Sequence, residues 1–334
     1  MKKNYIAALA AFMMAAVCMT GCGESIPDAE DGTKETPVLS LDDTDGKDEV
    51  LTMDDGSTVI ATDDGSFISE EDGGLVWNYL AGTCTVKFPI EWKDRFVVRG
   101  TSVYSKKCYE KKENSGELFT IVFSRDINML QGPKPAVVFG VIHDMYAVIT
   151  TPENPNYDAA DAEIATEYAD LSAKLSDVFQ NAVCGDTPNF KPINLTNYVP
   201  AAESAASVLP GTWKLASLTD DAAFSPYVVF RASDSTFGYK YGENDLKLGA
   251  YYANKNAETY EWNTDNWGDA GLIFSEGKVY RVTYYETAPR TLDFEVVYSP
   301  DAETDSLIGN KFNYDSEEQG IRQTEADPTE AALS

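Results

Sequence analysis

The strongest constraint on the fold lies between residues 210 and 314, where short apolar runs recur about every ten residues, separated by turn-forming residues. The runs are Gly211–Leu215, 227–232, 236–241, 248–253, 259–262, 271–275, 278–285, 290–298 and 307–314. The region shows no convincing helical period. Because short strands at this spacing belong to closed or stacked antiparallel sheets, residues 210–314 predict a small all-β barrel or sandwich.

Residues 75–184 combine strand signals with one long helical pattern. The strand-like runs are 83–88, 95–99, 102–109, 118–124, 136–141 and 146–150. From Asp161 to Val183 the apolar residues instead follow the spacing of one helix face. They are Ile164, Tyr168, Leu171, Leu175, Val178, Phe179 and Ala182. This order predicts an α+β domain whose antiparallel sheet is covered by one C-terminal helix.

The N-terminus has the features of an export signal. Lys2 and Lys3 precede an apolar run that is too short to span a bilayer comfortably, and the run ends in Met19-Thr20-Gly21-Cys22. This ending resembles the lipobox of bacterial lipoproteins, in which the signal is cut before a cysteine that then carries acyl chains. The resemblance implies a signal peptide over 1–21, lipidation at Cys22 with palmitate-like chains, and anchoring on the extracytoplasmic face of the cell membrane.

The negative charge is concentrated at the two ends of the chain. The formal net charge is −29, and residues 22–74 hold 17 acidic residues against Lys34 and Lys47. Residues 315–334 hold six acidic residues against Arg322. Such segments bury little apolar surface, so we expect a disordered acidic tether and a disordered acidic tail. The charge also disfavours nucleic acid as a partner.

Two shorter segments qualify this picture. Asp55-Gly56 lies between two β-prone runs and is a hairpin signal within the tether. Residues 185–209 are rich in Pro, Asn, Ala and Ser without any periodicity, which predicts a linker. A calcium loop around Asp43 and Asp45 lacks its first ligand and its glutamate, so we expect a solvated spacer there and no metal site.

Cysteine pairing stays open from the sequence. Cys18 leaves with the signal and Cys22 is the lipidation site, which leaves Cys84, Cys108 and Cys184. An odd number permits at most one disulfide within the chain. Cys84 and Cys108 are candidates to face each other on neighbouring strands, and three buried free thiols are an equal alternative.

Two further resemblances follow from short motifs. The order F-P-I-E-W-K-x-R-F (88–96), H-D-M-Y-A-V-I-T-T-P (143–152) and then the long helix resembles a domain of lipoproteins of unknown function from anaerobic Gram-positive bacteria. Gly211-x-Trp213 resembles the G-x-W signature of lipocalin-like barrels. That likeness implies that Trp213 closes the barrel bottom and that a basic residue, Arg281 or Arg290, packs over it.

The second region is rich in aromatic residues, which suggests where a ligand would bind. The candidate ligand-binding or barrel-closing residues are Trp213, Tyr239, Tyr251, Trp262, Trp267 and Tyr284. Inward aromatics either fill the barrel as its core or line a calyx for a small apolar or aromatic molecule. Residues 260–269 interleave two tryptophans with carboxylates and amides, a composition that also suits a glycan surface.

No motif in the chain proposes catalysis. His143 is the single histidine, and its neighbour Asp144 would point to the opposite face of a strand, so we interpret His143 as a turn residue. We therefore expect a non-enzymatic, membrane-anchored lipoprotein without a cofactor that binds a small apolar ligand in its barrel. The alternative is a cell-envelope interaction module that recognises a protein or a glycan through its surface.

Overall fold

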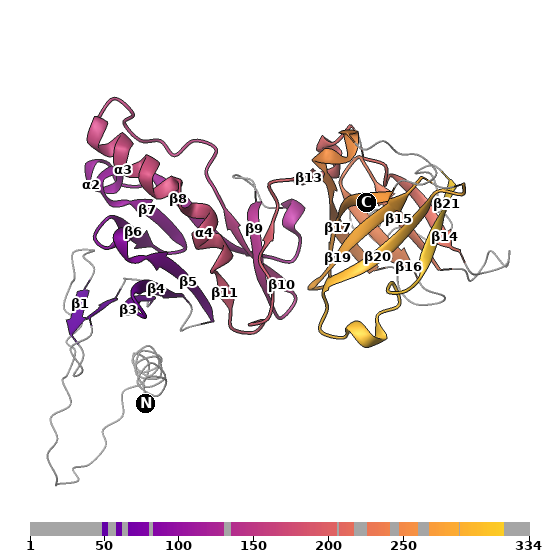
Figure 1. Cartoon of the computed structure of the whole chain (residues 1–334), viewed down its shortest axis with the longest axis horizontal. Helices are drawn as coiled ribbons and strands as arrows, with labels where there is room; N and C mark the ends of the chain where they lie inside the picture. The colour runs from indigo at the N-terminus through magenta and orange to yellow at the C-terminus, as the bar shows by residue number, and fades with distance from the viewer. Residues whose placement is uncertain are drawn as a thin grey trace, which may run out of the picture.

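The computed structural model describes residues 49–52, 58–61, 66–79, 83–129, 135–205, 207–216, 226–240, 247–259, 267–286 and 288–316. These residues form a mostly β protein with two units side by side (Figure 1). The first is an N-terminal unit of strands and short helices, and the second is a closed β-barrel. The expected signal over 1–21, Cys22 and most of the acidic tail lie outside the described residues.

The N-terminal unit contains two six-stranded sheets, where the sequence predicted one. The first sheet consists, in spatial order, of β1 (Glu49–Thr52), β2 (Thr58–Ala61), β3 (Phe67–Glu71), β4 (Gly74–Tyr79), β5 (Cys84–Pro89) and β11 (Val183–Cys184). The second consists of β12 (Ile193–Asn194), β9 (Pro135–Ile142), β10 (Met145–Thr150), β8 (Glu117–Ser124), β7 (Ser102–Ser105) and β6 (Phe96–Arg99). The short helix η1 (Ile90–Trp92) carries the chain from one sheet to the other.

Both sheets and the helices share one core. Alternate residues of β5, namely Cys84, Val86 and Phe88, face this core together with Phe119 of β8 and Phe179. The predicted long helix is present as a bent pair, α3 (Ala162–Ser172) and α4 (Leu175–Gln180). The bend follows a tight turn in which the Lys174 amide bonds back to the Leu171 carbonyl. It lets α3 pack on β7 and β8 while α4 reaches β5 and β9.

Two sequence expectations for this unit need correction. The expected tether to residue 74 contains β1, β2, β3 and the first residue of β4, and Phe67 and Ile68 are buried. In β3 the side chains of Phe67 and Ile68 are buried while Glu70 is exposed, so a high count of acidic residues did not exclude strands in this segment. The run 102–109 is β7 followed by a short helix, α2 (Lys106–Lys111), which removes Cys108 from any strand beside Cys84.

The second unit is an antiparallel barrel closed by eight strands (Figure 1). They are β14 (Gly211–Leu215), β15 (Tyr227–Arg231), β16 (Thr236–Lys240), β17 (Lys247–Asn254), β18 (Trp267–Ser275), β19 (Lys278–Tyr285), β20 (Thr291–Tyr298) and β21 (Lys311–Ser316). Each pairs with its neighbour in sequence, and β14 pairs with β21 to close the ring. The run expected over 259–262 is different: Thr259 ends the short helix η4 (Lys255–Thr259), and 260–262 lie outside the described residues.

Residues 185–209, which the sequence predicted to be a linker, contain two short strands, one paired with each unit. β12 extends the second sheet, while β13 (Tyr198–Pro200), which precedes η3 (Ala201–Glu203), pairs with β17 of the barrel. Phe190 and Leu195 are buried between the units. The segment has no periodicity because its buried residues contact different strands and do not form one regular face of their own.

A third core cluster lies where β9 and β10 meet β17 and β18. Tyr146 packs edge-on against Phe274 at 5.4 Å, and its hydroxyl donates to the Lys278 carbonyl at 2.8 Å. The Asn128 side chain donates to the Ser235 carbonyl at 2.9 Å. β9, β10 and the C-terminal parts of β17 and β18 are therefore buried on both faces, which explains why their sequences there are nearly continuous apolar runs.

Candidate functional site

Side chains fill the described interior of the barrel. Trp213, Phe230, Tyr251, Tyr284 and Phe312 are each at most 1% exposed and belong to one packed cluster. Phe230 lies 5.3 Å from Phe237 and 5.0 Å from Tyr251 between ring centroids. An eight-stranded barrel is just wide enough for such a filling. Of the two readings that the sequence left open, the packed core is therefore the one that these residues adopt.

The sequence-predicted aromatics separate into three positions. Trp213, Tyr251 and Tyr284 are part of the core, and the Trp213 indole donates to the Leu209 carbonyl at 2.9 Å. Tyr239 also belongs to this core and lines a pocket at one end of the barrel, whereas Trp267 lies on the outside of the barrel. Trp262 lies outside the described residues. The five described residues of this set therefore do not converge on one cavity.

The expectation that a basic residue packs over Trp213 is met only in part. Arg290 lies with its guanidinium 3.8 Å from the ring centroid of Tyr314, and Tyr314 in turn packs edge-on against Trp213 at 5.2 Å. Arg281 faces outward and pairs with Glu295 at 3.0 Å and with Asp269 at 3.6 Å. Arg290 is thus at the Trp213 end, with a tyrosine between the two side chains.

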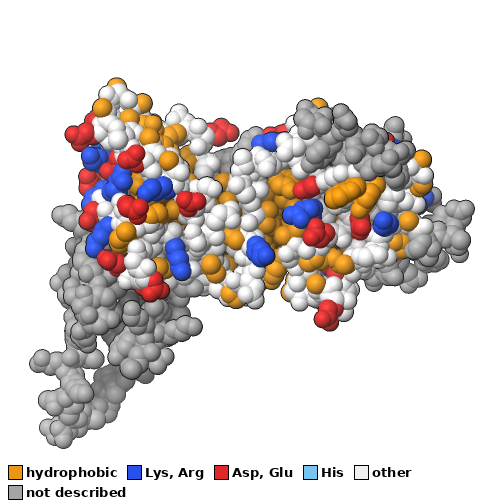
Figure 2. All heavy atoms as spheres, viewed as in Figure 1, with side chains coloured by type: hydrophobic (Ala, Val, Ile, Leu, Met, Phe, Trp, Pro, Cys, Tyr) orange, Lys and Arg blue, Asp and Glu red, His pale blue; other side chains and the backbone are white. Residues whose placement is uncertain are grey.

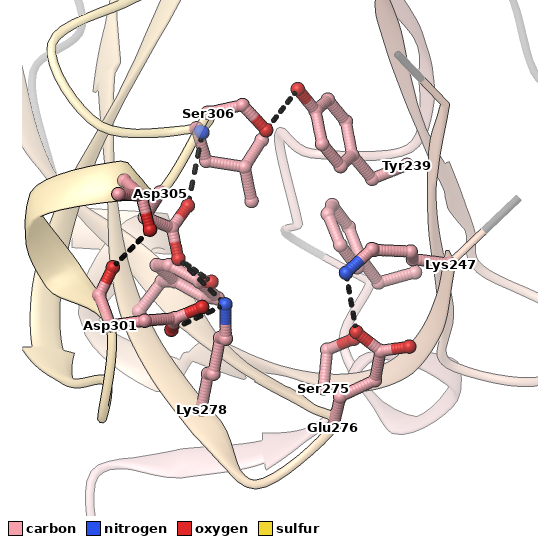
Figure 3. A pocket seen from close by; sticks show the side chains of 12 residues that line it. Tyr239, Lys247, Ser275, Glu276, Lys278, Asp301, Asp305 and Ser306 are labelled. Atoms are coloured by element: carbon pink, nitrogen blue, oxygen red, sulfur yellow. Dashed lines mark hydrogen bonds and ion pairs between the residues drawn. The ribbon is translucent and has the colours of Figure 1, made fainter. Parts of the chain in front are cut away.

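A small polar pocket lies at one end of the barrel, between the β18–β19 turn and the loop before β21 (Figure 3). Lys278 reaches Asp301 at 2.8 Å and Asp305 at 3.3 Å, and the Tyr280 hydroxyl donates to Asp305 at 2.5 Å. On its other wall the Tyr239 hydroxyl donates to Ser306 at 2.9 Å. Lys247 pairs with Glu276 at 2.8 Å.

The charged groups of this pocket are paired with one another. Burial pulls the pKa of Lys278 down, but its ion pairs with Asp301 and Asp305 outweigh burial and leave that pKa raised. The Lys278 hydrogen bond lowers the pKa of Asp301, while burial, with help from Asp305, raises the pKa of Tyr280. The pocket volume of about 130 Å³ corresponds to about four waters. Ligand sites normally need 300–1,000 Å³, so the pocket is too small and too self-paired for an apolar guest.

A wider depression runs along α3 in the N-terminal unit. It has about 420 Å³ of open space and is lined by charged side chains such as Lys107 and Glu163, which pair at 3.1 Å. Arg95 and Asp170 pair at 3.2 Å beside it. Figure 2 shows acidic and basic side chains interspersed over this end of the molecule. Exposed pairs of this kind describe a solvated surface rather than a binding cleft.

The outer face of the barrel presents an aromatic surface at the end where β18 begins. Trp267 is 67% exposed, whereas the other exposed large apolar side chains of the described residues reach only 36–37%. Trp267 and Tyr285 are direct cross-strand partners, with ring centroids 6.5 Å apart and planes 32° apart. The Lys311 ammonium lies 5.1 Å from the Tyr285 ring centroid.

Polar side chains border these rings. Because side chains alternate along a strand and Tyr284, Leu292 and Phe312 point inward, Thr291 is the outward partner directly opposite Tyr285. The next outward row holds Thr283, Asp293 and Lys311. We call Trp267, Tyr285, Thr291, Thr283, Asp293 and Lys311 the Trp267 face. It combines two ring surfaces with two hydroxyls, a carboxylate and an ammonium group. The sequence pointed to Trp267 through its polar surroundings, but not to Tyr285 or Lys311, because cross-strand register brings these in.

Neighbouring Asp269 and Tyr198 tie this face to the segment between the units. The Tyr198 hydroxyl donates to the Asp269 carboxylate at 2.5 Å. Burial raises the pKa of Asp269 against the opposing effects of Tyr198 and Arg281. Burial and this carboxylate also raise the pKa of Tyr198. The pair holds β13 against the barrel and leaves neither group free for proton transfer.

Other functional classes gain no support from the described part of the chain. It contains no group of three or more His, Cys, Asp or Glu side chains that are arranged to hold a metal ion. None of its helices has the length and apolarity to cross a bilayer. His143 is exposed in the β9–β10 turn with a φ of 57°, as expected for a turn residue.

Comparison of the chain with protein-family models, with curated proteins and with solved structures finds no match. The Trp267 face and the filled barrel are the features of the described residues that bear on function.

Proposed function

We propose that this chain is a lipid-anchored protein of the extracytoplasmic membrane face that binds cell-envelope glycan through the Trp267 face. The lipobox-like sequence ending at Cys22 supports the anchor. The observation that carries the binding role is the 67% exposure of Trp267 beside the Tyr285 ring. Water-exposed rings of this size are costly to leave uncovered, and flat rings rimmed by polar groups suit the apolar faces and hydroxyls of sugars.

The barrel serves as a scaffold in this proposal. Its sequential antiparallel order, with β14 closing on β21, supports a lipocalin-like relationship. The alternative of an apolar ligand inside it needs space that Trp213, Phe230 and Tyr284 occupy. A scaffold has to be rigid, and a barrel filled by packed side chains is rigid. The protein acts by binding and not by catalysis.

The test of binding uses the mature chain from residue 22 with Cys22→Ser, which is soluble without an anchor. It is mixed with protein-free cell-wall glycan and pelleted, and bound protein is measured against glycan concentration. Trp267→Ala should weaken binding at least tenfold, since an exposed tryptophan at a binding centre is worth about 2 kcal/mol. Leu248→Ala is the matched control, because Leu248 is an exposed apolar residue (37%) elsewhere on the same barrel.

Equal binding by Trp267→Ala and the parent chain would refute the assigned face, and failure of the parent chain to pellet would refute glycan binding. The anchor has a separate readout. Labelled palmitate should enter the full chain in a lipoprotein-processing bacterium and should be lost in Cys22→Ala. Its absence from the parent chain would refute the anchor without touching the binding result.

A further inference from the structure

The three described cysteines are buried free thiols in the structure, and two of them are direct cross-strand neighbours. β5 and β11 are antiparallel, and their register pairs Cys84 with Cys184 and Thr85 with Val183. The Gly185 amide donates to the Thr83 carbonyl at 2.5 Å. Hydrogen-bonded and non-hydrogen-bonded pairs alternate along such a ladder, so Cys84 and Cys184 form a non-hydrogen-bonded pair.

This type of pair suits a disulfide. Opposite residues at such a position have Cα atoms about 4.5 Å apart, which lies within the range of about 4.4–6.8 Å that disulfides span. Both side chains are 0% exposed and lie in the same core cluster, so the sulfurs are on the same side of the sheet. The two thiols also affect each other's titration: contact with Cys184 raises the pKa of Cys84, and contact with Cys84 lowers the pKa of Cys184 to about 7.

The surroundings leave room for both sulfurs. Gly140 of β9 lies directly under Cys184, and a Cβ at residue 140 would approach the Cys184 Cβ to 2.2 Å. Cys108 is placed differently. It belongs to α2 and packs against Gly116, where a Cβ would approach its sulfur to 2.5 Å. Burial raises the pKa of the Cys108 thiol, which keeps it protonated and unreactive.

We propose that Cys84 and Cys184 form a disulfide as the chain folds in the presence of a disulfide-containing oxidant, and that Cys108 stays a free thiol. The thiolate of one cysteine attacks the oxidant disulfide and releases one oxidant thiolate. The sulfur of the other cysteine, after losing its proton, attacks the mixed disulfide and releases the second. Two protein thiols are thus oxidised, one oxidant disulfide is reduced to two thiols, and two protons leave the protein.

Full burial sets the timing of this step. An oxidant cannot reach sulfurs that are 0% exposed, so the mixed disulfide forms before β11 closes onto β5. Closure then brings the second sulfur to it, and the finished bond is protected from reductant. The bond ties the two-residue edge strand β11, which follows α4, to its neighbour β5 in the first sheet. Its occurrence in the cell depends on the proposed extracytoplasmic location, whereas its formation in vitro depends only on the geometry.

The test therefore refolds the chain in vitro. The full chain with Cys18→Ser and Cys22→Ser, so that three cysteines remain, is diluted from denaturant into a glutathione redox buffer. Remaining thiols are then alkylated in denaturant and counted by mass. We expect one alkylated thiol per chain, and a tryptic peptide pair that joins Cys84 to Cys184 and separates on reduction. Cleavage after Lys87, Lys107 and Lys174 places the three cysteines on different peptides.

Matched variants identify the pair. Adding Cys108→Ser should leave no alkylated thiol, and adding Cys184→Ser should leave two. In the folded oxidised protein the bond should resist reductant until denaturant is added. Three alkylated thiols in a refolded chain with native circular dichroism, or a link to Cys108, would overturn the proposal. A bond that forms in vitro but is missing from protein isolated from cells would leave the geometry standing and would refute the extracytoplasmic location.

Discussion

Replacing Phe230 with alanine tests whether the barrel is filled by its own side chains. Phe230 of β15 is 0% exposed and packs against Phe237 and Tyr251 at 5.3 and 5.0 Å between ring centroids. Removing a ring from such a site loses its transfer free energy and leaves a cavity, at a cost of about 3–5 kcal/mol. If the ring instead lined an open calyx, little packing would be lost and the cost would be about 1 kcal/mol.

The assay is urea unfolding followed by circular dichroism and tryptophan fluorescence, with a thermal melt beside it. A loss of about 3–5 kcal/mol lowers the melting temperature by roughly 6–20 °C for a protein of this size. Leu248→Ala on the outer surface is the matched control and should change stability by less than about 0.5 kcal/mol. A folded Phe230→Ala protein that loses less than about 1 kcal/mol would refute the filled barrel and restore the calyx.

Two further predictions concern the N-terminal unit. Glu167→Ala should lower the free energy of unfolding in urea by about 2–4 kcal/mol, because the buried carboxylate accepts hydrogen bonds from Ser105 Oγ at 2.8 Å and from the Lys107 amide at 2.9 Å. The control is Glu163→Ala, which removes an exposed carboxylate from the same helix and should cost far less. Equal losses in the two variants would contradict this account. Hydrogen bonds from Lys111 and from the helix amides that Asp161 caps hold the pKa of Asp161 below its ordinary value of 3.8. The ionised carboxylate therefore adds to the free energy of unfolding above pH 3.8, and this stabilisation disappears as the pH falls through the lower folded-state pKa. Asp161→Asn keeps the cap but not the charge, so the urea midpoints of this variant and the parent should differ at pH 7 and converge once the pH is below the folded-state pKa of Asp161. A difference that persists in acid would show that the charge is not responsible.

The sequence by itself determined most strands of the barrel and the apolar face of the C-terminal helix of the first unit. The recurring runs after Gly211 predicted a small β-barrel, and the periodicity from Asp161 predicted the helix that the structure shows bent. Alternation along a strand is a local property, so it is legible without any knowledge of the partner strand. For the same reason Trp213, at the first barrel strand, could be singled out from its motif.

Only the tertiary structure determined what packs against the second face of a strand that is buried on both sides. The apolar runs of β9, β10, β17 and β18 pack on both sides because the two units meet there, and no local pattern names the opposing surface. Cross-strand register brought Cys184 opposite Cys84 and Tyr285 beside Trp267, across about 100 and 18 residues of chain. These pairings depend on the summed packing of the whole sheet, which is why the aromatic surface and the cysteine pair emerge from the fold and not from the motifs.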